Sequence, residues 1–240
     1  MPLLLTLDTS TLAGSVAVSR DEELLGESLL QGPGNHTDHL LRQIRDLLAA
    51  LELDLAQVDA LGVVLGPGSF TGVRVGVATA KGLAQALERP LYGVTSLEVV
   101  AHQLPAVEMP ITVLLDARKQ EVYAGHFRWI GDELQSLAAA AVGKVETMVA
   151  DLTEPTLLVG RGAQLYRERL EQCLGERARF APASVETPRA ATVAAMVQRQ
   201  IAAGVAAPPL CRLLPCYIRP SEAEIAAARK EAQNERQRSL

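Results

Sequence analysis

Residues 3–8 of this 240-residue chain read Leu-Leu-Leu-Thr-Leu-Asp, an apolar run that ends in an aspartate. Such a run, followed by the polar stretch 9–11 (Thr-Ser-Thr), predicts a buried strand that ends in a turn. Residues 111–116 read Ile-Thr-Val-Leu-Leu-Asp and repeat the pattern. An alternating segment and a third strand-like segment follow in both places. Each half of the chain therefore opens with hairpin-linked strands, and an aspartate ends the first of them.

These two openings indicate a duplicated β-β-β-α-β-α unit, because internal similarity at a long period is typical of a repeated architecture. The alternative is two unrelated α/β stretches that share turn chemistry. Duplication is favoured because the aspartate stands at the same place in both halves. The expected elements are strands at 3–7, 15–19, 24–30, 61–65 and 91–94 with helices at 35–53, 71–87 and 96–103, and then strands at 111–115, 121–129, 133–137 and 156–159 with helices at 163–174 and 192–203.

A break at Pro105 is the expected boundary between the halves. It divides the chain into an N-terminal lobe, residues 1–104, and a C-terminal lobe, residues 105–214. A charged helix with a capping-box pair at its start is expected over 221–238. The predicted fold class is α/β with two duplicated lobes.

The composition limits the classes of function. Hydrophobic residues make up 48%, so the chain is not intrinsically disordered. The 23 Lys and Arg against 28 Asp and Glu give a net charge of −5, and aromatic residues make up only 3%. A direct nucleic-acid-binding module is therefore disfavoured, because it needs a basic surface and aromatic stacking platforms. A local basic patch stays open, although no basic run is visible.

The chain is expected to be cytoplasmic and to have no membrane segment. Its start carries no basic leader of a signal peptide. No apolar stretch reaches the roughly 18 residues that a membrane helix needs. The cysteines Cys173, Cys211 and Cys216 are a sparse, odd set, which is typical of a reducing compartment.

A glycine-rich segment, residues 66–76 (Gly-Pro-Gly-Ser-Phe-Thr-Gly-Val-Arg-Val-Gly), leads into the second expected helix. Its amides stand where a helix N-terminus favours an anion. Its spacing matches neither a Walker loop nor a dinucleotide fingerprint, and Phe70 occupies the centre of what would be a nucleophile elbow. The favoured interpretation is a tight strand-to-helix turn.

Small residues recur every four positions in that helix, at Gly72, Gly76, Ala80 and Ala84. Two mid-helix glycines cost about 1 kcal/mol each relative to alanine. Close approach of another element would offset this cost. That element is either the chain's own core or a partner helix, and the sequence leaves both open.

Few side chains form a convincing catalytic set. Asp8 and Asp116 each end a strand at a turn, so they either cap their turns, which is favoured, or hold Mg²⁺ or a phosphate-bound water. His102 and His126 are isolated, and the cysteines have no companions at zinc spacing.

Several motifs together resemble the TsaB (YeaZ) family. They are Asp8-Thr-Ser10, the helix start Asn35-His-Thr37, residues 66–76, Asp116-Ala-Arg-Lys-Gln-Glu-Val-Tyr123 and Pro215-Cys-Tyr-Ile-Arg219. The resemblance implies two ribonuclease-H-like lobes of the actin/Hsp70/sugar-kinase (ASKHA) type, with the C-terminal segment, about 215–240, packing back on the first lobe. It also implies a role in making threonylcarbamoyladenosine in tRNAs that read codons starting with A.

The resemblance extends to TsaD, the paralogue that transfers the threonylcarbamoyl group and carries its metal pair as His-x-Glu-x-His. Here Ser96 and Val100 replace the metal histidines, and Glu98 alone persists. Neither serine nor valine substitutes for a neutral imidazole ligand. His102 falls two residues late. The resemblance thus implies a pseudoenzyme with no catalytic and no metal-binding residues.

A non-catalytic partner of TsaD is the function that follows from the resemblance. It implies a TsaD heterodimer formed by the two helices 35–53 and 71–87, a ternary complex with TsaE, a functional link to TsaC, tRNA contact only through the complex, and a homodimer of the free chain. The expected interface residues are Leu41, Ile44, Leu48, Gly72, Val73, Gly76, Val77, Ala80 and Ala84.

Two alternatives stay open beside this scaffold role. The family has been grouped with M22 peptidases, although no zinc ligands or nucleophile support a protease here. Nucleotide binding is the other, with ATP or ADP as a possible cofactor. Its candidate residues are Asp8, Ser10, Asp116, Gly160 and Gly162.

Overall fold

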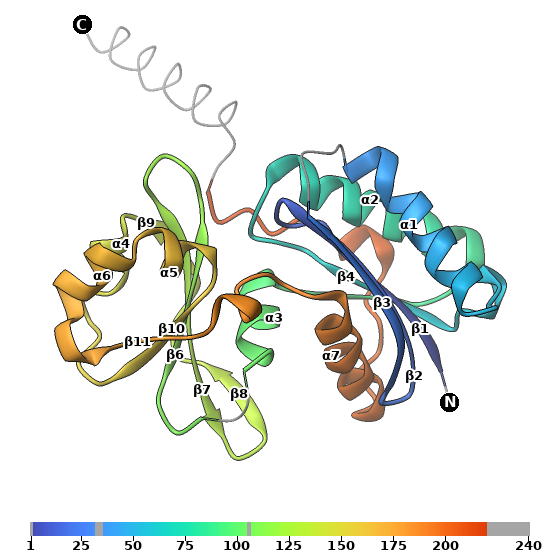
Figure 1. Ribbon diagram of the computed structural model, residues 1–240. Helices are drawn as coiled ribbons and strands as arrows, with labels where there is room; N and C mark the ends of the chain where they lie inside the picture. The colour runs from blue at the N-terminus through green and yellow to red at the C-terminus, as the bar shows by residue number, and fades with distance from the viewer. Residues whose placement is uncertain (1, 32–35, 105–106, 220–240) are drawn as a thin grey trace, which may run out of the picture.

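Two mixed sheets, one in each lobe, form the framework of the computed structural model, which describes residues 2–31, 36–104 and 107–219 (Figure 1). The first sheet has the strand order β3-β2-β1-β4-β5. Its strands are β1 Leu3–Asp8, β2 Ala13–Arg20, β3 Glu23–Gln31, β4 Ala60–Val64 and β5 Leu91–Val94. The helices α1 (His36–Ala50) and α2 (Phe70–Leu87) cover one face of it, with the short 3-10 helix η1 (Leu55–Gln57) between α1 and β4 (Figure 1).

The second sheet has the order β11-β10-β6-β7-β8, and β9 pairs with β7. Its strands are β6 Ile111–Asp116, β7 Val122–Ile130, β8 Glu133–Ser136, β9 Ala141–Gly143, β10 Thr156–Val159 and β11 Ala178–Phe180. The helices of the remaining chain are α3 Ser96–His102, α4 Val145–Met148, α5 Arg161–Leu165, α6 Arg167–Leu174 and α7 Ala190–Ala202, with 3-10 turns η2 Gly175–Arg177, η3 Ala183–Val185 and η4 Leu210–Arg212.

The expected duplication is present in the strand pairing. In the first sheet β1 is antiparallel to β2 and parallel to β4. In the second sheet β6 is antiparallel to β7 and parallel to β10 in the same way. Both first strands lie inside their sheets, and every residue of β1 is buried. A strand covered on both faces reads as a continuous apolar run, which is the pattern seen at 3–8 and 111–116.

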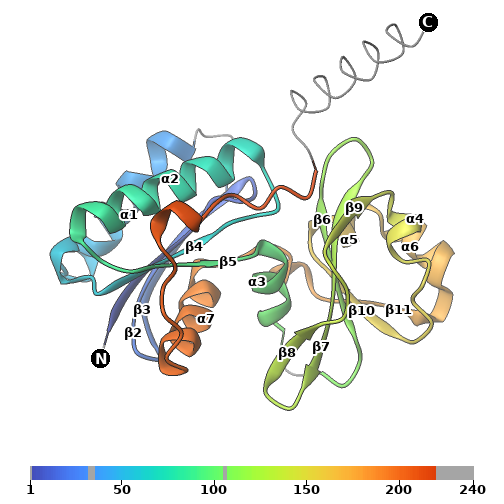
Figure 2. The same ribbon diagram turned by 180° about the vertical axis from the view of Figure 1, so that it is seen from behind.

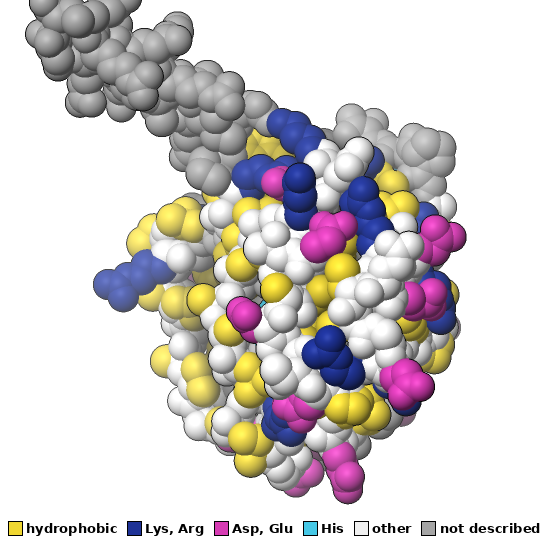
Figure 3. All heavy atoms as spheres, turned by 90° about the vertical axis from the view of Figure 1, so that its left-hand side faces the viewer, with side chains coloured by type: hydrophobic (Ala, Val, Ile, Leu, Met, Phe, Trp, Pro, Cys, Tyr) yellow, Lys and Arg dark blue, Asp and Glu magenta, His cyan; other side chains and the backbone are white. Residues whose placement is uncertain are grey.

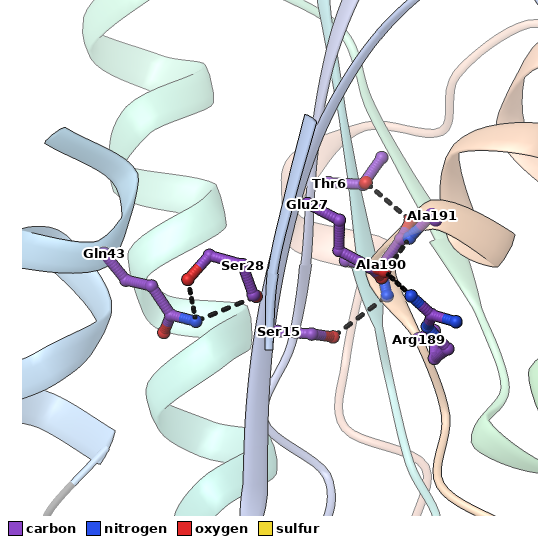
Figure 4. Close-up of polar contacts among 8 residues, drawn as sticks. All are labelled: Thr6, Ser15, Glu27, Ser28, Gln43, Arg189, Ala190 and Ala191. Atoms are coloured by element: carbon purple, nitrogen blue, oxygen red, sulfur yellow. Dashed lines mark hydrogen bonds and ion pairs between the residues drawn. The ribbon is translucent and has the colours of Figure 1, made fainter. Parts of the chain in front are cut away.

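Helix α7 packs on the face of the first sheet opposite to α1 and α2 (Figures 1 and 2). Figure 4 shows how its start is held. The Thr6 hydroxyl donates to the carbonyl of Ala190 at 2.7 Å, and the amide of Ala190 donates to Ser15 Oγ at 2.9 Å. Arg189 forms an ion pair with Glu27, whose side chain is only 5% exposed. This corrects the expected assignment of residues 105–214 to the second lobe, because α7 completes the core of the first.

Helix α3 is the opposite case, an element from the first half of the chain that packs on the second sheet. It follows the last strand of the first sheet but contacts β6 and β7 of the second. Leu97, Val100 and Ala101 lie in the core cluster of the second lobe. Although α3 precedes the expected boundary at Pro105, it packs in the core of the second lobe, because an apolar helix face packs on the nearest uncovered sheet face.

On the opposite face of the first sheet, α1 is held by a buried glutamine (Figure 4). Gln43 Nε2 donates to the carbonyl of Gly14 at 3.2 Å and to the carbonyl and hydroxyl of Ser28 at 2.9 and 3.0 Å. Asn35, the expected first residue of the helix 35–53, and the expected charged helix 221–238 lie outside the described residues. Within the described residues, no helix is long and apolar enough to cross a membrane.

Candidate functional site

The turn after β1 packs against the start of α2. Ser69 is the N-cap of α2, and its hydroxyl accepts from the amide of Gly72 at 3.2 Å. The Ser69 amide donates to the carbonyl of Ser10 at 2.7 Å. The Thr9 hydroxyl donates to the carbonyl of Gly72, also at 2.7 Å. The turn that follows Asp8 and the glycine-rich segment 66–76 therefore pack directly against each other.

The glycines of this segment are explained by that contact. A Cβ on Gly68 would lie 2.1 Å from the carbonyl oxygen of Ser10, and one on Gly72 would lie 2.1 Å from that of Thr9. A Cβ on Gly76 would lie 2.3 Å from Thr9 Oγ1. Real Cβ atoms do not approach other atoms so closely. The prediction of a tight strand-to-helix turn is confirmed.

The small residues of α2 face the chain's own core, which corrects the expected interface. Within the expected set, Leu41 alone is exposed, at 57%. The others are buried in the first lobe, because α2 must approach β1 and β4 closely. They are Ile44, Leu48, Gly72, Val73, Gly76, Val77, Ala80 and Ala84.

A second small-residue stripe lies on the outer face of α2, and the sequence reasoning missed it. Thr71, Ala78, Gly82 and Ala86 are all exposed. A Cβ on Gly82 would meet nothing within 4 Å, so packing within the chain does not require glycine there. The spacing of four between Ala78, Gly82 and Ala86 was the signal available in the sequence.

Asp8 is enclosed, and its carboxylate is only half satisfied. Oδ1 accepts from the amide of Ser10 at 2.8 Å, whereas Oδ2 and the Ser10 hydroxyl are buried without a hydrogen-bond partner among the described residues. Complete burial raises the pKa of the Asp8 carboxyl to about 6, against the lowering effect of the hydrogen bond from the Ser10 amide. A carboxyl with no exposed surface does not reach a ligand between the lobes.

The second lobe repeats this turn in a more open form. Asp116 Oδ1 accepts from the amide of Arg118 at 2.9 Å, and its side chain is 25% exposed. Gly160 and Gly162 pack against the chain, since a Cβ on either would lie 2.8 Å or less from the carbonyl oxygen of Leu114. Among the residues that the structure describes, no hydrogen bond or ion pair joins the side chains of Asp8 and Asp116.

The expected nucleotide-binding residues therefore do not fit a Mg²⁺-nucleotide. Asp8 is completely buried, and Asp116 caps its own turn. The glycines Gly160 and Gly162 are occupied by packing against β6. No chemistry through a nucleotide follows from this arrangement.

The positions of the paralogue's metal histidines lie in α3. Ser96 and Val100 are completely buried, and the Ser96 hydroxyl donates to the carbonyl of Pro67. Glu98 is used at the helix start, where it accepts from the amide and hydroxyl of Thr95 at 3.0 and 2.7 Å. In the described part of the chain, no group of three His, Cys, Asp or Glu side chains could hold a metal ion.

His102, the nearest imidazole, is engaged elsewhere. Its Nδ1 lies 2.9 Å from the carbonyl oxygen of Glu98, and its ring meets Trp129 edge-on with 5.6 Å between centroids. Burial lowers the pKa of the His102 imidazole below its usual range. It is a packed residue at the end of α3 rather than a displaced metal ligand.

Known proteins match the chain along most of its length. The family model described as TsaD, tRNA N6-adenosine threonylcarbamoyltransferase, matches residues 33–227. The tRNA threonylcarbamoyladenosine biosynthesis protein TsaB of Bacillus subtilis (strain 168) is 29% identical over 228 residues, 92% of this chain and 96% of that protein. TsaB of Escherichia coli (strain K12) is 33% identical over 171 residues, 68% of this chain and 73% of that protein.

A solved structure from Pseudomonas aeruginosa, described as an uncharacterized protein with similarity to peptidase YEAZ, has a TM-score of 0.79 at 31% identity. The match covers 91% of this chain and 100% of that chain. The two duplicated ribonuclease-H-like lobes are of the actin/Hsp70/sugar-kinase type. On these matches, the chain belongs to the TsaB (YeaZ) family of tRNA threonylcarbamoyladenosine biosynthesis proteins.

Proposed function

We propose that this chain is a non-catalytic subunit that binds and supports TsaD while threonylcarbamoyladenosine is formed in tRNAs reading codons that start with A. The observation that carries the proposal is the complete burial of Ser96 and Val100 at the positions of the paralogue's metal histidines. Neither side chain is an imidazole, and neither reaches a substrate. Catalysis in this proposal belongs to TsaD, and this chain is a pseudoenzyme paralogue.

The outer face of the α1–α2 pair is the proposed TsaD-binding surface. It is formed by Leu41 on α1 and by Ala78, Gly82 and Ala86 on α2, C-terminal to Phe70 and Arg74 on that helix. Exposed small residues allow the backbone of a partner helix to approach closely, and Leu41 supplies an exposed apolar contact. The buried residues of α2 act indirectly, because they hold the helix on its sheet.

The same surface serves the other expected assemblies. In the proposal the free chain forms a homodimer through it, and the TsaD heterodimer replaces that homodimer. TsaE joins as the third subunit, TsaC supplies the intermediate, and the chain acts in the cytoplasm. tRNA is reached in the assembled complex.

The enzyme alternatives have no specific observation in their favour. The peptidase similarity comes from the name of a relative. The described residues bring together neither a metal-ligand cluster nor a nucleotide pocket from the expected set. We therefore propose no activity for the isolated chain.

Reconstitution tests the proposed function. TsaC, TsaD and TsaE are combined with tRNA, threonine, bicarbonate and ATP, with and without this chain, and the modified nucleoside is measured by mass spectrometry. We expect modification only when this chain is present. Equal modification without it would refute the supporting role.

A Gly82→Arg variant tests the surface. The position is open, so the fold should survive, and binding to TsaD in a calorimetric titration should be lost. Ala195→Arg is the matched control, because Ala195 is exposed on α7 across the sheet from α2. Loss of binding in the control, or retained binding in Gly82→Arg, would contradict the assignment.

A further inference from the structure

A strap formed by residues 214–219 crosses from the first lobe to the second (Figures 1 and 2). On the first lobe, the amide of Cys216 donates to the carbonyl of Leu65 at 2.6 Å. On the second lobe, the Arg219 guanidinium donates to the carbonyl of Ala117 at 2.8 Å and forms an ion pair with Glu121. The strap therefore links the segment before α2 to the β6–β7 turn.

The first part of the surface along this strap is an exposed aromatic cluster around one guanidinium. The guanidinium carbon of Arg74 lies 3.5 Å above the centroid of the Phe70 ring, and its Nε donates to the Tyr217 hydroxyl at 2.6 Å. The centroids of the Phe70 and Tyr217 rings are 5.2 Å apart, and the two residues are 41% and 44% exposed. Solvent-facing rings beside a guanidinium are the side chains on which unpaired nucleic-acid bases stack.

The second part is the β6–β7 turn, which has an uncommon backbone. Arg118, Lys119 and Gln120 have φ angles of 61°, 52° and 59°, three consecutive non-glycine residues in the left-handed region. Such a conformation is unfavourable for each of them and persists only where the surroundings hold it. Arg219 supplies that support by binding both ends of the turn, at Ala117 and Glu121.

The turn presents two cationic side chains to solvent. The Arg118 side chain is 72% exposed, and its only described acid contact is to Asp116 at 3.9 Å. Lys119 is exposed as well. Figure 3 shows several Lys and Arg side chains at the upper end of this face, with a smaller number of acidic side chains among them. A chain with a net charge of −5 thus has a local concentration of positive charge.

We propose that this strap surface, formed by Phe70, Arg74, Arg118, Lys119 and Tyr217, is an RNA contact site. Arg118 and Lys119 bind backbone phosphates, and the rings of Phe70 and Tyr217 take an unpaired base. The inference rests on the proposed function, since it assigns this chain a direct share in holding tRNA within the complex. It also revises the expectation that tRNA is reached only through the partner subunits.

RNA fits the surface better than an acidic peptide does. Acidic peptides need cations but make no use of a tilted pair of exposed rings around a guanidinium. RNA uses both, because phosphates and base faces lie side by side along a single strand. The patch is small in an acidic chain, so the isolated protein binds weakly and the contribution is largest in the complex.

The test removes charge without disturbing the backbone. Asparagine tolerates positive φ, so Arg118→Asn/Lys119→Asn keeps the turn while deleting both cations. An unmodified transcript of a tRNA that reads codons starting with A is titrated with the TsaD complex, and binding is measured by fluorescence anisotropy. The KCl concentration is varied from roughly 50 to 200 mM, where phosphate contacts respond to salt. We expect about tenfold weaker binding to the TsaD complex, and a salt slope reduced by about 2.

Two further variants separate the contributions. Arg118→Lys/Lys119→Arg retains the charges and should bind like the parent chain. Phe70→Leu should weaken binding about fivefold at every salt concentration, because stacking does not release counterions. Arg20→Asn/Arg89→Asn is the charge-matched control, since Arg20 ends β2 opposite Leu3, away from Asp8, and Arg89 follows the C-terminal end of α2.

Complex formation is measured first by size-exclusion chromatography, which keeps the two proposals apart. If the parent chain forms no complex with TsaD, the proposed function fails, and the same variants are compared on the free chain at low salt. An unchanged tRNA affinity and salt slope in Arg118→Asn/Lys119→Asn would overturn the RNA site. So would a loss of TsaE binding with tRNA affinity intact, which would assign the surface to a protein partner.

Discussion

Two glycines in one helix should respond to alanine in opposite ways. Gly72 and Gly82 both lie in α2, and alanine is the better helix former at either position by about 1 kcal/mol. At Gly72 the new Cβ would stand 2.1 Å from the backbone carbonyl oxygen of Thr9. At Gly82 it would stand in open space. Helix propensity alone therefore predicts that alanine stabilises the fold equally at both positions. Packing predicts instead that Gly72→Ala destabilises the fold and Gly82→Ala stabilises it.

The expected magnitudes follow from those distances. An ordinary carbon–oxygen contact is about 3.3 Å, so Gly72→Ala forces the β1–β2 turn and α2 apart by about 1 Å. The obstacle is backbone, which does not rotate away. Overpacking of this kind costs about 1–3 kcal/mol, and a clash with backbone places the cost at the upper end, about 3 kcal/mol, from which the propensity gain of about 1 kcal/mol is subtracted. We expect a net loss of about 2 kcal/mol for Gly72→Ala and a gain of about 0.5–1 kcal/mol for Gly82→Ala.

Thermal and urea unfolding followed by circular dichroism measure both variants. For a chain of this length, about 1 kcal/mol corresponds to a Tm shift of about 2–4 °C. Gly72→Ala should therefore melt about 4–8 °C lower than the parent, and Gly82→Ala about 1–4 °C higher. A Gly72→Ala variant as stable as the parent would refute the close approach of Thr9, and with it the explanation of the glycine-rich segment.

Two other variants probe buried polar groups of the first lobe. The pKa of Asp8 is raised from 3.8 to about 6, so the neutral carboxyl stabilises the fold below pH 4, and this contribution of about 3 kcal/mol is lost as the pH rises through 6. In urea unfolding from pH 4 to 8, Asp8→Asn should therefore gain stability relative to the parent. A stability difference that does not change with pH would contradict the burial of Asp8. Gln43→Ala removes the hydrogen bonds that the side-chain amide donates to Gly14 and Ser28. It should cost about 2–3 kcal/mol in the same assay, whereas substitution of the exposed neighbour Arg42 by alanine should cost less than about 0.5 kcal/mol.

Local patterns in the sequence predicted the elements that depend on local chemistry. The apolar runs 3–8 and 111–116 form the central strands, and the aspartate at the end of each accepts a backbone N–H two residues on. Residues 66–76 form a strand-to-helix turn, as their glycine spacing indicated. Glu98, the one residue of the paralogue's motif that persists, caps the start of α3.

The orientation of α2 illustrates what local patterns leave open. Residues Gly72, Gly76, Ala80 and Ala84 formed a stripe suited to either a core or a partner. Tertiary packing turned this stripe inward, because the turn at Thr9 needs space that only glycine leaves. The outer stripe through Gly82 was equally regular in spacing. Periodicity identifies the faces of a helix but does not say which sheet lies beneath it.

The sequence by itself determined the duplicated strands, the tight glycine turn and the absence of histidines at the paralogue's metal positions. Tertiary structure alone decided that α3 and α7 exchange lobes, that α2 buries its small residues, and that Arg74 meets Tyr217 while Arg219 holds the turn at Ala117. These contacts join residues about a hundred or more positions apart. Local propensity carries no information about such pairings, because they depend on which sheet faces remain uncovered once both lobes have formed.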